Sequence, residues 1–357
     1  MYIESIKLSN FRNYENLELH LDQGTNIFYG DNAQGKTNIL ESVYLCGTSR
    51  SHKGSRDKEV IRFGQDESHI RMNVCKNRMN YQIDMHLRKN KAKGVAINGM
   101  PIKKARELLG VVNLVFFSPE DLNIIKNGPS ERRRFMDSEL CQLDRLYLTD
   151  LAGYNHILNQ RNKLLKEILG NTSLKDTLDV WDMQIAKGAS YIIKKRMETI
   201  GKINEIVSSM ESLLTDEKES ILIKYRKSGN QEERFDEEWY LEKLALSREE
   251  DSRFCHTSIG PHRDDLIFLM NGNDISSYGS QGQQRTAILS VKLAELEFVK
   301  KETGEYPLLL LDDVGSELDK ERRDALFSYL IEKEIQTIIT TTDESLGAYG
   351  KEIKIEG

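Results

Sequence analysis

The eight residues Gly30–Thr37 constrain the fold of this chain more than any other segment. They read Gly-Asp-Asn-Ala-Gln-Gly-Lys-Thr and match the pattern G-x-x-x-x-G-K-[ST]. The two glycines let the backbone curl so that its N–H groups point inward at phosphate oxygens, and Lys36 is placed to reach the β- and γ-phosphates. A short apolar run, Asn26–Tyr29, precedes the motif, and a helical pattern, Thr37–Cys46, follows it. The sequence therefore predicts a strand, a phosphate-binding loop and a helix, in that order, within an α/β fold.

A second element lies far along the chain. The run Leu308–Leu311 predicts a buried strand, and Asp312 and Asp313 follow it directly. An Asp at the carboxyl end of such a strand is placed where P-loop proteins hold magnesium, so Asp312 and the Thr37 hydroxyl are the predicted metal ligands. Asp313 is then predicted to orient or deprotonate the attacking water. The alternative for Asp313 is a cap on a helix or turn.

Patterns of hydrophobic residues divide the chain into three stretches. The first 118 residues contain strand patterns, such as the alternation at Tyr81–Leu87 and the tight-turn pair Asn98-Gly99. Residues 119–251 are mainly helical, with one candidate strand at Ile221–Tyr225, and lack a long heptad array, so we expect compact helices there. Mixed patterns return from 252. The predicted organisation is one α/β domain, 1–118 plus 252–357, split by a helical insertion, 119–251.

Composition narrows the class of protein. No apolar run approaches the roughly 20 residues that span a bilayer, and the first residues lack a basic segment followed by an apolar one, so neither a membrane span nor a signal peptide is predicted. The cysteines are scattered without metal-ligand spacing, which is typical of reduced thiols in a cytoplasmic protein. The net charge of −6 argues against indiscriminate nucleic-acid binding but is compatible with a local basic groove.

The remaining motifs resemble those of a known family. Ser280–Gln284 resembles the signature loop of ABC-type ATPases, and Ser316–Asp319 resembles their D-loop. The wide gap between P-loop and signature loop is similar to that of SMC-like DNA-repair ATPases. Further segments resemble the RecF family in the same order over nearly the full length: Phe11–Tyr14, Gly30–Glu41, Phe117–Leu122, Arg132–Phe135, Gly260–Asp265 and Ser280–Arg285.

This resemblance implies an ABC-type ATPase head with a helical arm, ATP and Mg²⁺ as ligands, and weak DNA-stimulated ATPase activity. In such ATPases two heads bury two ATP molecules, and the signature loop of one subunit meets the nucleotide of the other. Ser280 and the backbone N–H groups around Gly282 would supply that contact, so Ser280 joins Lys36, Asp312 and Asp313 as a predicted catalytic residue. The predicted nucleotide-binding residues are Gly30, Asp31, Asn32, Ala33, Gln34, Gly35, Lys36, Thr37, Ser280, Gln281, Gly282 and Gln283.

The resemblance also implies a biological role. RecF-like proteins are expected to bind DNA at gaps and at junctions of single and double strands, and to help load RecA together with RecO and RecR, in DNA repair and the SOS response. The candidate DNA-binding residues are Arg50 and Lys53, after the P-loop helix, and Arg132, Arg133 and Arg134, at the start of the insertion. The alternative for these side chains is a solvated surface or intramolecular ion pairing.

The sequence departs from the general ABC pattern at three places. Asp313 stands where transporters have Glu, Thr340–Asp343 occupies the strand end where many ABC proteins have a switch His, and no Q-loop Gln stands near Phe117–Asp121. The shorter Asp313 side chain implies slow hydrolysis. Two alternatives stay open from the sequence: a nucleotide-gated scaffold with negligible turnover, and a transporter-type ATPase subunit.

Overall fold

Strands and helices of the chain divide between two units. The structure, a computed structural model, describes residues 1–357 except 105–106, 215–219, 230–233, 314–317 and 356–357. Unit 1 comprises Met1–Leu122, Ser209–Lys218 and Arg285–Gly357, and unit 2 comprises Asn123–Ser208 and Glu219–Gln284. Residues 252–284 were predicted to belong to the ATPase head, but they lie in unit 2. The reason is that strand β10 (Asp265–Met270) pairs with β9 (Ile221–Arg226) of that unit. The functional division into head and arm stays a prediction.

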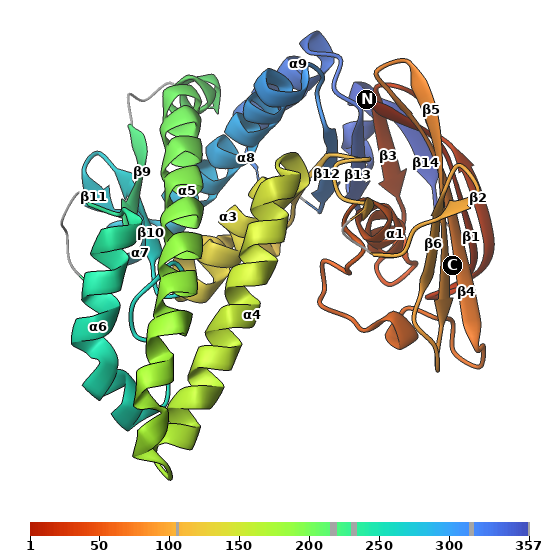
Figure 1. Ribbon diagram of the computed structural model, residues 1–357. Coiled ribbons are helices and arrows are strands. Elements are labelled where there is room, and N and C mark those ends of the chain that lie inside the picture. The colour runs from red at the N-terminus through yellow and green to blue at the C-terminus, as the bar shows by residue number, and fades with distance from the viewer. Residues whose placement is uncertain (105–106, 215–219, 230–233, 314–317, 356–357) are drawn as a thin grey trace. The chain divides into compact units, whose positions relative to one another are not determined.

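An antiparallel sheet of six strands forms one layer of unit 1 (Figure 1). Its order is β2-β1-β4-β5-β6-β7, with β1 at Tyr2–Phe11, β2 at Tyr14–His20, β4 at Glu67–Lys76, β5 at Met79–Arg88, β6 at Gly94–Ile97 and β7 at Met100–Pro101. Alternate residues of each strand face opposite sides, so Ile70, Met72 and Val74 are buried while their neighbours are more exposed. The predicted turn at Asn98-Gly99 is confirmed, with φ of 51° and 77° between β6 and β7.

A parallel sheet of five strands forms the second layer of unit 1. Its order is β14-β3-β13-β12-β8, with β3 at Thr25–Tyr29, β8 at Leu114–Phe117, β12 at Leu308–Asp312, β13 at Thr337–Thr341 and β14 at Lys351–Lys354. All four pairings are parallel, so the carboxyl ends of the strands meet at one edge. The strands predicted before the P-loop, at Asn26–Tyr29, and at Leu308–Leu311 are confirmed.

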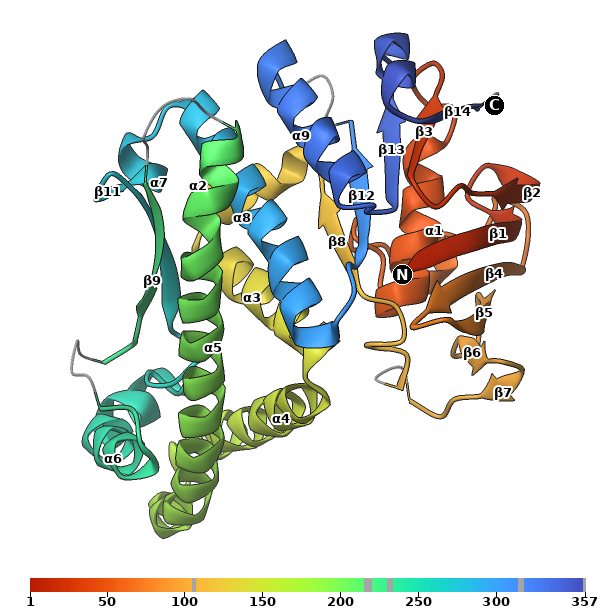
Figure 2. The same cartoon turned by 90° about the horizontal axis from the view of Figure 1, so that it is seen from above.

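Helix α1 (Lys36–Thr48) lies between the two sheets of unit 1 and contacts β4 on one side and β8, β12 and β13 on the other (Figure 2). Ile39, Leu40 and Val43 on this helix are fully buried in the core that both sheets share. The unit also contains α9 (Lys320–Glu332) and most of α8 (Gln281–Thr303). The buried Gln336 side chain accepts from Ile3 N (2.6 Å) and donates to the Ile3 and Asp22 carbonyls, which ties β1 to the start of β13.

Unit 2 is mainly helical. Its elements are α2 (Leu122–Lys126), α3 (Pro129–Leu143), α4 (Arg145–Ile168), most of α5 (Leu178–Leu214), α6 (Glu237–Phe254), α7 (Ile275–Tyr278) and the antiparallel sheet β11-β10-β9, with β11 at Asn273–Asp274. The expectation of compact helices is wrong for α5, which runs for 37 residues. This helix continues through Gly188, where an added Cβ would lie 3.2 Å from the Tyr154 ring, so the glycine lets α4 pack closely. Among the described helices, none is long and apolar enough to cross a membrane.

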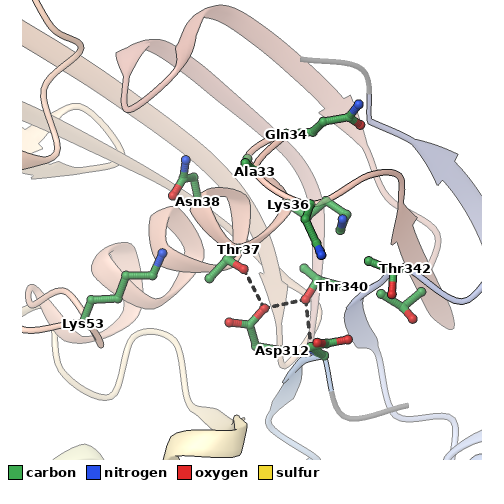
Figure 3. Close-up of a pocket in the computed structure, with 13 residues that line it drawn as sticks. Ala33, Gln34, Lys36, Thr37, Asn38, Lys53, Asp312, Thr340 and Thr342 are labelled. Atoms are coloured by element: carbon green, nitrogen blue, oxygen red, sulfur yellow. Dashed lines mark hydrogen bonds between the residues drawn. The ribbon is translucent and has the colours of Figure 1, made fainter. Parts of the chain in front are cut away.

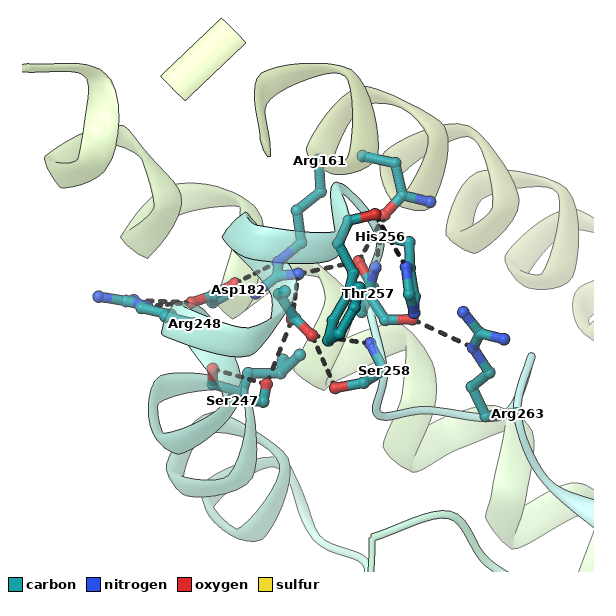
Figure 4. Close-up of polar contacts among 12 residues, drawn as sticks. Arg161, Asp182, Ser247, Arg248, His256, Thr257, Ser258 and Arg263 are labelled. Atoms are coloured by element: carbon teal, nitrogen blue, oxygen red, sulfur yellow. Dashed lines mark hydrogen bonds and ion pairs between the residues drawn. The ribbon is translucent and has the colours of Figure 1, made fainter. Parts of the chain in front are cut away.

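A buried ionic network holds the helices of unit 2 to one loop (Figure 4). Arg161 on α4 has no exposed surface, and its guanidinium donates to Asp182 on α5 and to Asp251 on α6, both at 2.7 Å. It also donates to the Thr257 hydroxyl at 2.9 Å. Asp251 in turn accepts from the backbone N and hydroxyl of Ser258. Three helices and the loop that leads into β10 therefore meet at one guanidinium.

Candidate nucleotide site

At two positions of the P-loop, Gly30 and Gly35, the backbone has a conformation that only glycine adopts easily. Gly30 has φ of 150° and Gly35 has φ of 99°. A Cβ on Gly35 would lie 2.5 Å from the Asn13 side chain, and one on Gly30 would lie 2.6 Å from the Ile355 carbonyl oxygen. Side chains at these positions would therefore be strained as well as crowded. The loop joins β3 to α1, as the sequence predicts.

Lys36 lies inside the loop that precedes it. Its side chain is almost fully buried, and the ammonium donates to the carbonyls of Gly30 (2.6 Å) and Asp31 (2.8 Å). The first backbone N–H groups of α1 have no partners within the helix, so this end of the helix attracts anions. A cation and a helix N-terminus at the same place make the loop a site for phosphate groups.

The predicted metal ligands meet at the carboxyl edge of the parallel sheet (Figure 3). The Thr37 hydroxyl donates to Asp312 Oδ1 at 2.8 Å, although 275 residues separate the two in the sequence. Thr340 Oγ1 donates to the same carboxylate oxygen at 2.5 Å, because β12 and β13 pair with Asp312 opposite Thr340. The backbone N of Asp313 donates to the Thr340 carbonyl (3.0 Å). Neighbouring parallel strands thus place one carboxylate beside the P-loop threonine.

These groups line one open cavity of about 230 Å³. Complete pockets for small ligands span about 300–1,000 Å³, so the cavity suits the phosphate chain of a nucleotide more than a whole nucleotide. Its lining residues are Asn32, Ala33, Gln34, Gly35, Lys36, Thr37, Asn38, Lys53, Asp312, Asp313, Thr340, Thr341 and Thr342. The lining is polar and carries both cationic and anionic side chains, as a site for a metal-bound phosphate requires.

Comparisons with known proteins identify the family. The model of the RecF/RecN/SMC N terminal domain family matches residues 2–353. Two proteins named DNA replication and repair protein RecF, from Agathobacter rectalis and Lachnospira eligens, are each 57% identical to this chain. Each match covers 96% of this chain, and it covers 92% of the Agathobacter protein and 93% of the Lachnospira protein. The chain belongs to the RecF family.

Solved structures agree with this membership. The structure named as the recombination mediator protein RecF-ATPrS in the RecFOR pathway has a TM-score of 0.91 and 37% identity, and covers 99% of this chain and 96% of that one. An Smc head bound to a domain of ScpA has a TM-score of 0.60 at 16% identity, which shows a shared fold. The predicted fold, an ABC-type head split by a mainly helical insertion, is confirmed. The RecF family comprises DNA repair ATPases of the SMC-like type, and membership in it favours this class over the alternative of a transporter-type ATPase subunit.

The predicted signature loop of this RecF-family chain lies at the start of α8. Ser280 Oγ accepts from Gln283 N (3.2 Å), and Gln283 Oε1 accepts from Ser280 N (3.0 Å), so the two side chains form a capping box. Ser280, Gln281 and Gly282 are exposed. These residues do not belong to the set that lines the cavity within the described chain. In the predicted D-loop, Ser316 and Glu317 lie outside the described residues.

The basic residues proposed for DNA differ in their surroundings. Arg132 makes two hydrogen bonds to the Asp265 carboxylate (2.7 and 3.1 Å), and Arg133 donates to the Asp264 carbonyl (2.6 Å). Arg134 is exposed, with a loose pair to Glu131 at 3.7 Å. Arg50 is exposed, and Lys53 lines the phosphate cavity. Arg132 and Arg133 thus form hydrogen bonds within unit 2, and Lys53 lies where it could contact a bound nucleotide.

Two supports of the site were missed from the sequence. Thr340 holds Asp312, and the signal for it was the threonine run at the end of the neighbouring strand. Asn13 braces the P-loop: its Nδ2 donates to the Gln34 carbonyl (3.1 Å), and its Oδ1 accepts from Asn38 (2.9 Å). Both contacts depend on sheet register and turn geometry that no spacing in the sequence reveals.

An ion pair anchors the segment that carries Lys53. Arg12 donates to both oxygens of Glu41 (2.7 and 2.6 Å) and to the Ser55 hydroxyl (2.7 Å), while Ser51 also donates to Glu41. Burial alone would raise the pKa of Glu41, but the hydrogen bonds from Arg12 and Ser51 outweigh it and hold the pKa below its ordinary value. Glu41 is therefore a charged buried anchor between α1 and the segment that follows it.

Proposed function

We propose that this chain binds ATP with Mg²⁺ at Gly30–Thr37 and Asp312 and uses the nucleotide to control its assembly on DNA. The observation that carries the proposal is the contact of the Thr37 hydroxyl with Asp312 Oδ1 at 2.8 Å, beside the buried ammonium of Lys36. The parallel sheet thus brings a phosphate-binding loop and a carboxylate from distant parts of the chain to one edge, where both could contact a metal-bound phosphate. The RecF structures named with ATP and ATPrS support the choice of nucleotide.

The residues around Asp312 fit a magnesium ion. Thr37 and Asp312 offer a hydroxyl and a carboxylate oxygen, and Mg²⁺ prefers hard oxygen donors and completes its shell with water and substrate phosphates. Thr37 and Asp312 would hold the ion, which would neutralise charge on the β- and γ-phosphate oxygens. Lys36 would then turn from the Gly30 and Asp31 carbonyls toward the phosphates.

Turnover is proposed to be slow and to need a second subunit. Asp313 is exposed and lies at the cavity, where its carboxylate would orient or deprotonate the attacking water. The exposed N-terminus of α8, with Ser280 as its cap, would meet the γ-phosphate held by another copy of the chain. ATP would then hold two heads together, and hydrolysis would release them.

The proposed substrate of this switch is DNA at gaps and at junctions between single and double strands. RecO and RecR are the proposed partners, and loading of RecA in the cytoplasm is the proposed outcome, on the strength of the RecF relatives. Arg50 and Arg134 are exposed and are the proposed residues for phosphate contacts of DNA. Arg132 and Arg133 would contribute mainly by holding unit 2 in shape.

The nucleotide site is tested with Lys36→Met. Loss of the ammonium should weaken ATP binding in the presence of Mg²⁺ by at least about tenfold, because a charge-assisted contact contributes roughly 1.5–3 kcal/mol. Titration calorimetry measures the affinity, and Lys58→Met, at an exposed lysine outside the cavity, is the matched control. Equal affinities for the two variants would refute the role assigned to the P-loop.

The composite site is tested with Ser280→Arg. A long cation at the start of α8 should block close approach of a second copy, so ATP binding should persist while ATP-dependent dimerisation is lost. Light scattering with and without ATP measures the molar mass, and Ser277→Arg, on the exposed part of α7, is the control. Normal dimers of the Ser280 variant would contradict the proposal. Single-turnover hydrolysis with and without gapped DNA separates an ATPase from a scaffold with negligible turnover.

A further inference from the structure

Three potential metal ligands lie together on the outer face of the six-stranded sheet of unit 1. They are Glu67 and His69 on β4 and His86 on β5. The inner face of these strands is buried, with Ile70 on β4 and Met85 on β5 in the core. Because side chains alternate along a strand, the three ligands point away from that core. They are therefore separate from the nucleotide site, and the proposed function uses none of them.

The register of the sheet brings the ligands together. His69 and His86 are direct partners across β4 and β5, and their rings stack with centroids 3.9 Å apart and planes at 20°. Glu67 is two residues from His69 on the same face, and its Oε2 lies 2.8 Å from His86 Nε2. One ligand atom from each side chain lies within 4.8 Å of the others. Within the described residues, no second group of this kind is found.

Neighbouring groups leave this arrangement open to solvent. The charges next to the cluster are mixed: Arg71 pairs with Asp84 at 2.6 Å, and Arg88 on β5 lies opposite Glu67. Gly94 on β6 lies opposite His86 and offers no side chain to cover it. The side chains of Glu67 and His86 are 58% and 32% exposed, so they can rotate at little cost. An ion can reach the site from solvent.

We propose that Glu67, His69 and His86 bind one Zn²⁺ ion. Two imidazoles and a carboxylate are the ligand set of open three-ligand zinc sites, with water in the fourth position. With Zn–N bonds of about 2.0–2.1 Å, ligand atoms on a tetrahedral ion are about 3.3 Å apart. Because an ion lies in the plane of each imidazole that binds it, the stacked rings of His69 and His86 would rotate apart on binding. Binding would replace the hydrogen bond between Glu67 and His86 by a bond from each side chain to the ion. Zn²⁺ would cross-link β4 and β5 on the face away from α1.

The test titrates Zn²⁺ into the full chain, purified with a histidine-free tag and stripped with EDTA. All titrations use the Asp312→Asn background in excess Mg²⁺, so that the nucleotide site does not contribute. We expect one Zn²⁺ per chain by calorimetry, a higher unfolding temperature with Zn²⁺, and at least about tenfold weaker binding in His69→Asn and His86→Asn. His20→Asn and His156→Asn, at exposed histidines elsewhere, are the controls and should bind like the parent.

Two further measurements make the result decisive. Unfolding of each variant in EDTA shows that its fold is intact, and the absorption of the Co²⁺ form shows whether thiolates of the four free cysteines take part. A Co²⁺ spectrum without thiolate charge transfer, lost in His86→Asn, supports the site. Zn²⁺ binding that is equal in the His86 variant and the controls, a thiolate band, or no binding at micromolar Zn²⁺ overturns the proposal.

Discussion

Replacement of Arg161 by methionine should destabilise unit 2 more than any exposed substitution on the same helix. Methionine fills much of the space but removes the cation that both Asp182 and Asp251 contact. Asp182 keeps an ion pair with Arg248 at 2.7 Å. Asp251, with a side chain that has no exposed surface, keeps only neutral donors such as Ser258. The variant therefore buries one carboxylate without a counter-charge.

The expected loss follows from that buried charge. Breaking a buried ion pair costs about 3–5 kcal/mol, because the remaining charge stays desolvated. For a unit of roughly 150 residues, each kcal/mol lowers the midpoint by about 2–4 °C, so a decrease on the order of 10 °C is expected.

The assay is tryptophan fluorescence during urea or thermal unfolding. Both tryptophans of the chain, Trp181 and Trp239, lie in unit 2, so the signal follows that unit. Arg145→Met, at an exposed arginine at the start of α4, is the control and should change stability by no more than about 0.5 kcal/mol. If the two methionine variants unfold at the same midpoint, the network does not stabilise unit 2 and this reasoning is wrong.

Two further predictions concern the nucleotide site and acid stability. Thr340→Val removes the hydroxyl that donates to Asp312 but keeps the shape of the side chain. The Mg²⁺ concentration for half-maximal ATP hydrolysis should therefore rise about 10–100-fold, while nucleotide binding without Mg²⁺ is unchanged. An unchanged Mg²⁺ dependence would show that Thr340 does not support Asp312 as a metal ligand. Burial lowers the pKa of His262 to about 4, below its ordinary value of about 6.5. Between these pH values the histidine is protonated in the unfolded state but not in the folded state. The free energy of unfolding should therefore fall by about 3 kcal/mol as the pH falls from 6.5 to 4. His262→Gln should remove this part of the pH dependence in fluorescence-monitored unfolding, and an unaltered slope would contradict the assignment.

Much of unit 1 was predictable because its signals are local. The P-loop needs glycine at two positions, and aliphatic runs mark buried parallel strands, so Gly30–Thr37 and Leu308–Asp312 stand out without any structure. That Asp312 meets Thr37 also followed, since parallel strands end at one edge. Family membership was predictable for the same reason: the matching segments are short, specific and in order.

The remaining features depend on contacts between distant residues. Arg161, Asp182 and Asp251 look like ordinary charged positions of amphipathic helices, and only the packing of three helices reveals that they are buried together. The length of α5 was missed because its stability comes from tertiary packing along one face and not from a heptad pattern. The pairing of His69 with His86 depends on a register that a shift of one residue would abolish.

The parallel sheet also determines when, during translation, this protein can acquire its ligand. The ribosome completes the P-loop early, but Asp312 is synthesised 275 residues after Thr37. At about 5–20 residues per second, that interval is roughly 15–55 s. Throughout it, the nascent chain carries the P-loop without the Asp312 carboxylate that contacts Thr37. Any product of premature termination before β12 would therefore lack the proposed metal ligand. Under the proposed mechanism, incomplete chains would be excluded from the ATP-dependent assembly.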